Sequence, residues 1–296
     1  MLSFGINQVF LAFAGAILPI LSSIPDASPQ PRVFSHADGS EPLLGNGVAL
    51  RIMPLGASIT YGVGSSDGNG YRAALRSLLL TSAPRAAAVN MVGSRRSGTM
   101  LDNDVEGWSG LRIAQVHDKA VNGSGRPVRS WKPNLVLVNA GTNDAAQGHQ
   151  IPGAERRMER MLRDVWDASP RATVLLSTLL VNKDPTTDKN ARRINEQYAR
   201  LAARLRDAEK RPVVLVDMQA AGGPGYEDLP DGTHPADEGY AKMARLWHAG
   251  VLEASDAGFL QAPEPVEGVP DDGVVSVAEA WPLGCCAWRR RRESRP

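Results

Sequence analysis

The chain has 296 residues, of which 43% are hydrophobic and 22% are charged. That length is enough for one large domain with its own hydrophobic core. The 33 basic and 32 acidic side chains leave a formal charge of +1, which gives no strong field to attract nucleic acid or an anionic membrane surface. The composition therefore predicts no nucleic-acid partner and favours a neutral or nearly neutral ligand.

The chain opens on an apolar run from Val9 to Ile24, which Pro19 interrupts and which Ser, Ala and Pro residues follow. This pattern is typical of a cleaved secretory signal, although no Lys or Arg precedes the run. A membrane anchor is the alternative, but the run is shorter than the roughly 20 residues of a spanning helix. We expect residues 1–31 to be a signal peptide and short linker, and the mature protein to be secreted without stable membrane insertion.

Buried strands alternate with stretches of helical period from Val48 onward, as in a parallel sheet covered on both faces. The expected strands are Leu50–Leu55, Val89–Val92, Leu135–Asn139, Thr173–Thr178 and Val213–Val216. The expected helices are Tyr71–Leu80, Ile113–Val121, Ala154–Ala168, Lys189–Glu209 and Glu238–Leu252. The order predicts a single α/β domain over residues 48–259, a three-layer α/β/α sandwich with a mostly five-stranded parallel sheet.

Pro and Asp crowd residues 262–272, and the chain ends in CCAWRRRRESRP. We expect residues 260–296 to be a disordered or loosely packed tail, whose four consecutive Arg are either a solvated terminus or an anion-binding patch. Cys285 and Cys286, the only cysteines, lie there, so the domain has no disulfide. The triplet at Asn122 is a glycosylation acceptor pattern that also occurs by chance.

Ser58 lies in the segment PLGASITYGVG, just after the first expected strand. Ligands of doubly wound sheets bind outside the carboxyl ends of the strands, and the small Gly56 permits a sharp turn that exposes the hydroxyl. By itself, a serine here is as well explained as a helix cap. Gly62 and Gly64 have the spacing of a dinucleotide loop, but Asp67 stands where the third glycine belongs.

Two further segments supply hydrogen-bond donors. Asn143, in NAGTND, follows the strand Leu135–Asn139 and either caps the next helix or offers its amide to a developing oxyanion. In EGWSGLRI, Gly107 and Gly110 flank Trp108 before a helix, where a glycine can present an unobstructed backbone N–H to an anion.

Asp231 and His234, in DGTHP, are three positions apart before the last expected helix. That offset can place the carboxylate beside the imidazole and fix its tautomer. A metal pair is the alternative, but no further ligand has suitable spacing, so we expect no metal. A hydroxyl activated by an imidazole requires no organic cofactor either, and we expect none. Among the other histidines, only His149 follows a polar loop from which it could reach such a site.

Taken together and in this order, the four segments resemble the SGNH (GDSL-type) hydrolases over roughly residues 51–252. The resemblance implies a flavodoxin-like sheet, Ser58 as nucleophile, and Asp231 with His234 as its triad partners. It also implies an oxyanion hole of the Ser58 amide, Gly110 and Asn143, with Gly107 as the second choice of glycine. The phrases MPLGASITYGVG, VGSRRSGTM, EGWSG and NAGTND look most like family 3 carbohydrate esterases, which include acetylxylan esterases.

The expected function is therefore that of a secreted serine esterase that removes short acyl groups, acetyl above all, from carbohydrate. Trp108 and Tyr61 adjoin the site segments and are candidates for stacking on a sugar ring, or else pack against loops. A lipase or lysophospholipase on the same scaffold is the alternative. Ala57 replaces the Asp of the usual Gly-Asp-Ser block, so a carbohydrate-binding protein with impaired catalysis is a further alternative. The sequence does not predict the oligomeric state.

Overall fold

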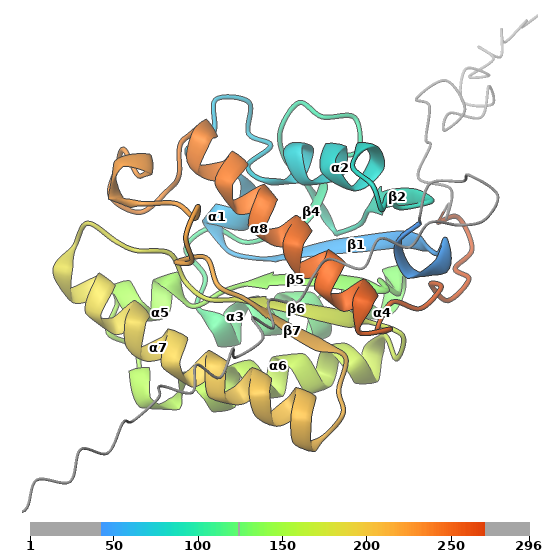
Figure 1. Cartoon of the computed structure of the whole chain (residues 1–296). Helices are drawn as coiled ribbons and strands as arrows, with labels where there is room; N and C mark the ends of the chain where they lie inside the picture. The colour runs from blue at the N-terminus through green and yellow to red at the C-terminus, as the bar shows by residue number, and fades with distance from the viewer. Residues whose placement is uncertain (1–42, 124, 270–296) are drawn as a thin grey trace, which may run out of the picture. The chain divides into compact units, whose positions relative to one another are not determined.

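A mostly parallel sheet forms the centre of the computed structural model, which describes residues 43–123 and 125–269 (Figure 1). Its strands are β1 (Ala49–Gly56), β2 (Ala88–Met91), β3 (Arg95–Arg96), β4 (Asp104–Gly107), β5 (Leu135–Asn139), β6 (Thr173–Ser177) and β7 (Val213–Val216). β1, β5 and β6 are mostly apolar runs that are buried on both faces, as a sheet between two helical layers requires.

The α-helices are α1 (Ser58–Tyr61), α2 (Arg72–Thr81), α3 (Ile113–His117), α4 (Pro127–Trp131), α5 (Thr142–Ala146), α6 (Ala154–Ala168), α7 (Pro185–Ala203) and α8 (Asp237–Asp256). Short 3₁₀ segments are η1 (Leu44–Asn46), η3 (Ile151–Gly153) and η5 (Tyr226–Asp228), and π-helical turns are η2 (Asp118–Asn122) and η4 (Arg204–Ala208). Along the part of the chain that the structure describes, no helix combines the length and the apolar character needed to cross a bilayer.

The five strands expected from the sequence are all present, and they lie in the order β2-β1-β5-β6-β7 with parallel pairing throughout. This is the flavodoxin-like order. Successive strands are added on one side of β1 up to β2 and on its other side from β5 onward, so the topological switch point lies between β1 and β5. The sheet has seven strands rather than five, because β4 pairs with the last two residues of β1 and the two-residue β3 pairs antiparallel with β4. The ends of β1 and β5 are therefore the expected position of a ligand site.

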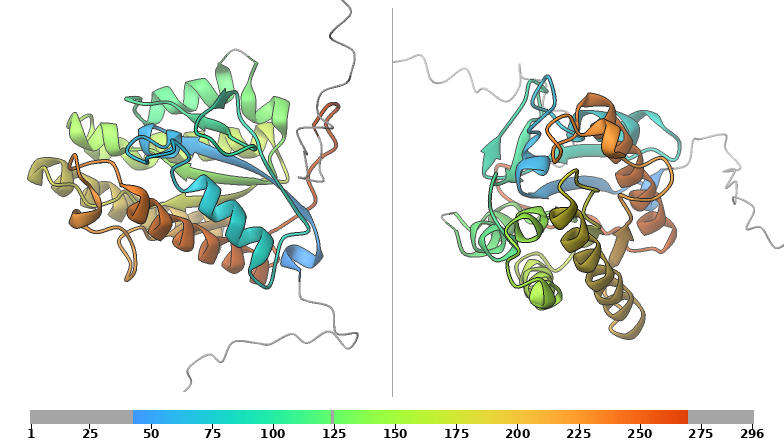
Figure 2. Two further views of the ribbon diagram at one scale, coloured as in Figure 1. Left: turned by 90° about the horizontal axis from the view of Figure 1, so that it is seen from above. Right: turned by 90° about the vertical axis from the view of Figure 1, so that its left-hand side faces the viewer.

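Two hydrophobic clusters cover the two faces of the sheet, and alternate residues of each strand contribute to one or the other. In β5, Val136 and Val138 belong to the cluster that includes α6 and α7, whereas Leu135 and Leu137 face α2 and α8. Figure 2 shows the resulting layers, with α2 and α8 on one side of the sheet and α3 and α6 on the other. Each fully buried aliphatic side chain contributes roughly 1.5–3 kcal/mol, so the three-layer arrangement needs no disulfide.

Most expected helices lie where they were predicted, and the differences have local causes. α6 has the predicted bounds Ala154–Ala168. α7 begins at Pro185 rather than Lys189, because the Asp184 carboxylate accepts the Thr187 amide at 2.7 Å and Pro185 fits the first helical position. The stretch predicted as Ile113–Val121 is an α-helix only to His117 and continues as the π-helical turn η2.

Residues 260–269 are the described part of the predicted C-terminal tail, and they and the preceding Phe259 make hydrogen bonds with the domain. Thr173 Oγ1 donates to the Phe259 carbonyl at 2.8 Å, and the Asn134 amide donates to the Gln261 carbonyl at 2.7 Å. Arg51 Nη1 donates to the Glu264 carbonyl at 2.9 Å, so this Pro-rich segment is bound through its backbone to the domain. The rest of the predicted tail, like residues 1–31, lies outside the described residues.

Candidate active site

Ser58 is the first residue of α1 and follows the end of β1 by two residues. It lies where the strand order changes direction, between β1 and β5. Its amide has no partner within the helix because it belongs to the first turn. Gly56 permits this position, since a Cβ there would lie 2.1 Å from the Asn139 carbonyl oxygen of β5. The close approach of β1 and β5 thus requires glycine just before the sharp turn to Ser58.

The loop after Ser58 is fastened to the start of α8, and this brings two distant parts of the chain together. A Cβ at Gly64 would lie 2.6 Å from the Pro235 carbonyl oxygen. Ser66 donates from both its amide (2.8 Å) and its hydroxyl (2.7 Å) to the Asp237 carboxylate, and the Tyr240 hydroxyl donates to the Val63 carbonyl. Gly64 is therefore explained by close packing against the segment that carries His234, whereas Gly62 packs against the Gly68 carbonyl.

Ser58, His234 and Asp231 form one continuous chain of hydrogen bonds. His234 Nε2 lies 2.8 Å from Ser58 Oγ, and His234 Nδ1 lies 2.7 Å from Asp231 Oδ2. Asp231 Oδ1 also accepts the backbone amides of His234 (2.7 Å) and Thr233 (2.9 Å), so the carboxylate is held by its own turn. Such an imidazole can accept the hydroxyl proton while the carboxylate stabilises the imidazolium that forms.

The same contacts set the ionisation of Asp231. Burial opposes the charged form, but the two backbone amides and the His234 imidazole outweigh it and lower the pKa of Asp231 to about 2. The carboxylate is consequently ionised over the whole neutral range, as a group that orients and stabilises an imidazolium must be.

Asn143 lies in the first turn of α5, after β5, and its side chain reaches the turn that follows β4. Asn143 Nδ2 donates to the Leu111 carbonyl at 3.0 Å, and that turn begins where the Trp108 amide donates to the Gly56 carbonyl at 2.9 Å. One amide hydrogen of Asn143 is thereby used for positioning. The second remains for another acceptor, because a side-chain amide nitrogen carries two donors.

The two candidate glycines of the 107–110 segment have different surroundings. Gly107 is the last residue of β4 and is buried, and a Cβ there would lie 2.7 Å from the Tyr61 amide nitrogen. Gly110 is exposed with a φ of 79°, in the turn that Asn143 contacts through Leu111, and no atom lies within 4 Å of a Cβ at this position. Gly107 thus serves packing, whereas Gly110 has the open backbone that a donor to substrate needs.

Trp108 and Tyr61 both lie against Arg95, a contact that the sequence did not predict. The Arg95 guanidinium carbon lies 4.5 Å from the Tyr61 ring centre and 4.6 Å from that of Trp108, and Lys119 Nζ lies 4.9 Å from the Trp108 ring centre. Trp108 Nε1 also donates to the buried Glu106 carboxylate at 2.6 Å. A sugar that stacks on these rings would have to share them with Arg95.

Asp144 is a second positioning group that sequence reasoning did not assign. Its fully buried carboxylate accepts the Ile113 amide at 2.9 Å and Arg157 Nη2 at 3.0 Å. The first contact ties the start of α5, which carries Asn143, to the start of α3, which follows Gly110. Its place next to Asn143 at a strand end was the available signal, whereas nothing in the sequence pointed to Arg157.

Two of the three remaining described histidines make polar contacts elsewhere. His149 Nδ1 lies 2.9 Å from Arg112 Nη1, His117 Nε2 lies 2.8 Å from Asp164, and burial lowers the pKa of His248. Within residues 43–123 and 125–269, no group of three or more His, Cys, Asp or Glu is arranged to hold a metal ion.

The Ser58 hydroxyl, the His234 imidazole and the Asp231 carboxylate thus lie in line at the carboxyl edge of a flavodoxin-like sheet. Residues 55–242 match the GDSL-like Lipase/Acylhydrolase family, and the chain belongs to that family. This membership places it among the carboxylic ester hydrolases.

Similar proteins include the "Multidomain esterase" of Ruminococcus flavefaciens, which is 29% identical over 247 residues, 74% of this chain and 31% of that protein. The chain thus spans about a third of that relative. A family 3 carbohydrate esterase of Clostridium thermocellum is similar in structure with a TM-score of 0.60 at 24% identity, covering 70% of this chain and 98% of the other. A carbohydrate esterase family 3 structure from Talaromyces cellulolyticus has a TM-score of 0.57 at 27% identity, covering 70% and 99%.

Proposed function

We propose that this protein is a secreted serine esterase that removes acetyl groups from carbohydrate, with Ser58, His234 and Asp231 as its catalytic triad. The observation that carries the proposal is the 2.8 Å contact between His234 Nε2 and Ser58 Oγ. An imidazole at this distance, with its other nitrogen bound to an ionised carboxylate, is suited to act as the general base.

The reaction begins when Ser58 Oγ attacks the ester carbonyl and His234 takes its proton. The negative charge on the carbonyl oxygen is stabilised by the Ser58 amide, the Gly110 amide and the free hydrogen of the Asn143 side chain. His234 then gives its proton to the leaving sugar hydroxyl, which leaves an acyl group on Ser58. Water, deprotonated by His234, attacks that acyl group and releases the acid, and the proton returns to Ser58.

The choice of carbohydrate acetates is supported by the neighbours. The Talaromyces cellulolyticus structure, at 27% identity, is of a carbohydrate esterase family 3. Tyr61 belongs to the same short helix as Ser58, and the Arg95 guanidinium lies over its ring and over that of Trp108, which places aromatic and cationic groups near the site. Secretion rests on the signal-like pattern of residues 1–31 and is tested by N-terminal sequencing of protein recovered from the culture medium.

The test of the proposal is a series of p-nitrophenyl esters from acetate to long acyl chains, together with acetate release from acetylated xylan. We expect acetate to be the preferred ester and acetate to be released, and both activities to be lost in Ser58→Ala. A preference for long acyl chains would instead make the protein a lipase-type acylhydrolase of the same family.

The replacement of the family Asp by Ala57 makes one further outcome informative. Ala57 is almost fully buried, directly before Ser58. Saccharide binding without hydrolysis of any ester in the series would mean that the site binds carbohydrate but has lost catalysis, and would contradict the proposed esterase.

A further inference from the structure

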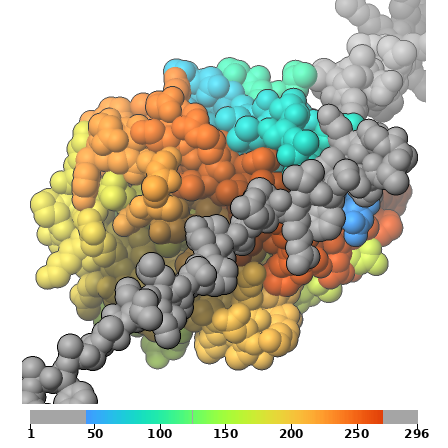
Figure 3. Space-filling model, in the orientation of Figure 1, coloured from blue at the N-terminus to red at the C-terminus, as the bar shows by residue number. Residues whose placement is uncertain are grey.

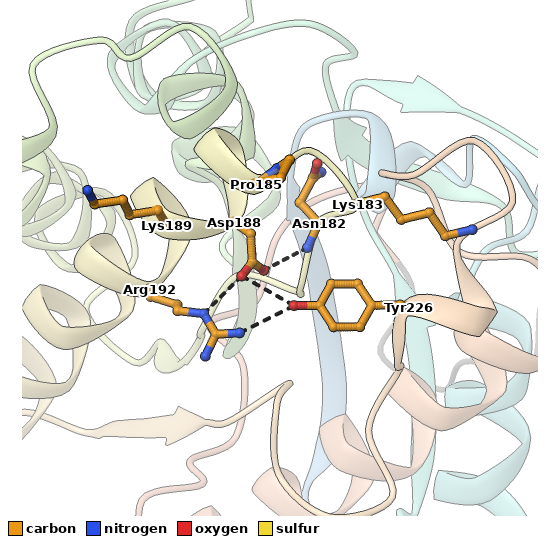
Figure 4. A pocket seen from close by; sticks show the side chains of 7 residues that line it. All are labelled: Asn182, Lys183, Pro185, Asp188, Lys189, Arg192 and Tyr226. Carbon is orange, nitrogen blue, oxygen red and sulfur yellow. Dashed lines mark hydrogen bonds and ion pairs between the residues drawn. The ribbon is translucent and has the colours of Figure 1, made fainter.

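In the space-filling view, the yellow residues of the α7 region and the orange residues that follow β7 meet on one face of the domain (Figure 3). A pocket of about 440 Å³ lies between these segments. There Asp188 accepts from Arg192 Nε at 2.9 Å and from the Tyr226 hydroxyl at 3.3 Å, so these side chains bind one another (Figure 4). Glu106, a buried carboxylate on β4, is bound differently, because one of its donors belongs to the turn that carries Gly110.

Glu106 is fully buried, and the proposed ester cleavage does not use it. One carboxylate oxygen accepts the Trp108 indole Nε1 at 2.6 Å, and the other accepts the Ser94 amide at 2.8 Å. A carboxylate is expensive to bury, and its oxygens need donors of this kind to offset that cost. An apolar side chain would fill the same space without the cost, so packing alone does not explain Glu106, and its contact with Trp108 provides a reason.

Trp108 is the first residue of the turn that presents Gly110. The Leu111 amide donates to the Trp108 carbonyl at 3.2 Å and closes the turn, in which Gly110 occupies the third position with a φ of 79°. A positive φ at the third position is the conformation of a type II turn and favours glycine. Among the residues that the structure describes, none accepts the Gly110 amide, so this donor is open.

Both ends of this turn are bound to other parts of the proposed site. At its start, the Trp108 amide donates to the Gly56 carbonyl at 2.9 Å, two residues before the proposed nucleophile. At its end, the Leu111 carbonyl accepts Asn143 Nδ2 at 3.0 Å. With both ends held, the direction of the Gly110 amide depends on how Trp108 is oriented.

Charged groups from three segments hold the Trp108 side chain. Besides Glu106 of β4, the Arg95 guanidinium of β3 lies 4.6 Å from the ring centre and also donates to the Gly107 carbonyl at 2.6 Å. Lys119 Nζ, on η2, lies 4.9 Å from the ring centre. Cations are attracted to the face of an indole ring, so they restrain its plane, while the bond to Glu106 restrains its rotation within that plane. The two strands that the sequence did not predict therefore carry two of the three groups that orient Trp108.

We infer that Glu106 is a positioning residue for ester cleavage: through the Trp108 indole, it fixes the turn that directs the Gly110 amide at the reacting carbonyl. This inference rests on the proposed function, in which that amide stabilises the oxyanion. A donor that is already in place needs no reorganisation when the negative charge forms, so its effect belongs to the transition state rather than to substrate binding. The Trp108 ring accordingly supports the turn and does not stack on a sugar.

The first test is the steady-state kinetics of p-nitrophenyl acetate hydrolysis by the full chain. Glu106→Gln keeps the size of the side chain but leaves one acceptor for two donors. We expect kcat to fall about tenfold with KM unchanged, less than the roughly 10²- to 10³-fold cost of losing one oxyanion donor completely. An unchanged kcat would overturn the inference.

Asp102→Asn is the matched control for this substitution. Asp102 accepts the Met91 amide at 2.9 Å and Arg76 Nε at 3.0 Å, so its carboxylate also binds a backbone amide and a side chain, but neither donor belongs to the turn. This variant should leave kcat nearly unchanged. Equal falls of kcat in Asp102→Asn and Glu106→Gln would mean that any loss of a buried carboxylate in this region impairs the enzyme, and the inference would fail.

A double-mutant cycle tests whether Glu106 acts through the indole. Trp108→Phe removes the Nε1 donor but keeps an aromatic ring, and should lower kcat by a similar factor of about ten. Combining it with Glu106→Gln should lower kcat no further, since both substitutions remove the same contact, whereas independent effects would multiply to about a hundredfold loss and overturn the inference. A rise in KM for acetylated xylan at unchanged kcat in Trp108→Phe would assign the ring to substrate binding and also overturn it.

Proton-nitrogen correlation NMR of isotopically labelled protein reads the contact without turnover. The Trp108 indole N–H, assigned from its absence in Trp108→Phe, should exchange with solvent about tenfold faster in Glu106→Gln than in the wild type, because its acceptor is weakened. Asp102→Asn should leave this exchange unchanged. Equal exchange in the wild type and Glu106→Gln would show that the carboxylate does not hold the indole, which contradicts the inference.

The same experiments separate this inference from the proposed function. Absence of aryl esterase activity in the wild type refutes the esterase and, with it, the role of the turn. An active wild type whose kcat is unchanged in Glu106→Gln refutes the positioning role alone. If Glu106→Gln does not fold, Trp108→Phe decides by itself, since an unchanged kcat in that variant overturns the inference.

Discussion

The two edges of the sheet both carry polar side chains, but those side chains are bound in different ways. At the carboxyl edge, Ser58 and Asn143 are partly exposed, and their functional atoms bind other loops by single contacts. At the amino edge, Arg51 and Asn134 are almost fully buried. Arg51 donates to the carbonyls of residues 131, 132 and 264, and Asn134 donates to those of residues 49 and 261. Under the proposed mechanism, polar residues at strand ends serve catalysis where their donors remain open, and they stabilise the fold where backbone carbonyls use those donors.

The largest effect should come from the relay at the carboxyl edge. Asp231→Asn should lower kcat for p-nitrophenyl acetate by about 10⁴-fold, because the imidazole is then held in the wrong tautomer. His149→Gln is the matched control, since His149 contacts Arg112 rather than the relay, and should change kcat less than twofold. Similar losses in the two variants would mean that the line of hydrogen bonds from Asp231 to Ser58 does not control the reaction.

Asn143→Ala should reduce kcat by about 10²- to 10³-fold with little change in KM, because one donor to the oxyanion is lost and it acts mainly in the transition state. Asn190→Ala is the control, as Asn190 Nδ2 donates to the Ala145 carbonyl at the other end of the same short helix. An equal reduction of kcat in Asn190→Ala would show that the effect of Asn143 is one of helix position rather than of its amide.

The amino edge should show the reverse behaviour. Asn134→Ala removes hydrogen bonds to the Arg51 amide and to the carbonyls of Ala49 and Gln261, and should lower the free energy of unfolding by about 2–4 kcal/mol. Urea denaturation measures this loss, while kcat/KM of the folded enzyme should stay within twofold of the wild type. A large fall in kcat/KM would remove the functional distinction between the two edges.

The smallest effect concerns pH. Because the pKa of Asp231 is lowered to about 2 in the folded protein, its carboxylate stabilises the fold at every pH above the unfolded pKa, and this stabilisation is lost as the pH falls toward 2. The difference in Tm between wild type and Asp231→Asn should therefore not shrink until the pH drops below about 4. A difference that already shrinks between pH 7 and 5 would contradict the assigned contacts.

The fold was largely predictable from the sequence because its central strands are continuous apolar runs. β5 and β7 have the predicted bounds, and β1 extends one residue further at each end. Strands β3 and β4 were missed because Arg95–Arg96 and Asp104–Gly107 are not apolar runs, and they are held in place by pairing with each other and with β1. Tertiary contacts of this kind leave no periodic pattern.

Residues 259–264 and the contact of Arg95 with Tyr61 and Trp108 show a second limit of prediction from sequence. Residues 259–264 bind the domain through backbone carbonyls, which every sequence has, so a Pro-rich composition gave no indication of their role. Arg95 stacks on Tyr61 and Trp108 although it is far from both in the sequence. In contrast, Ser58 and Asn143 follow strand ends, and Asp231 and His234 stand in a short motif before the last helix, so these positions can be identified without coordinates.

The most direct test of the central claim is active-site titration with a fluorophosphonate, followed by peptide mass spectrometry. The account predicts one equivalent of label on Ser58 in the wild type, no label in Ser58→Ala, and slow labelling in His234→Ala. Rapid labelling of Ser58 in His234→Ala, or no labelling of the wild type, would contradict the claim that His234 activates the Ser58 hydroxyl.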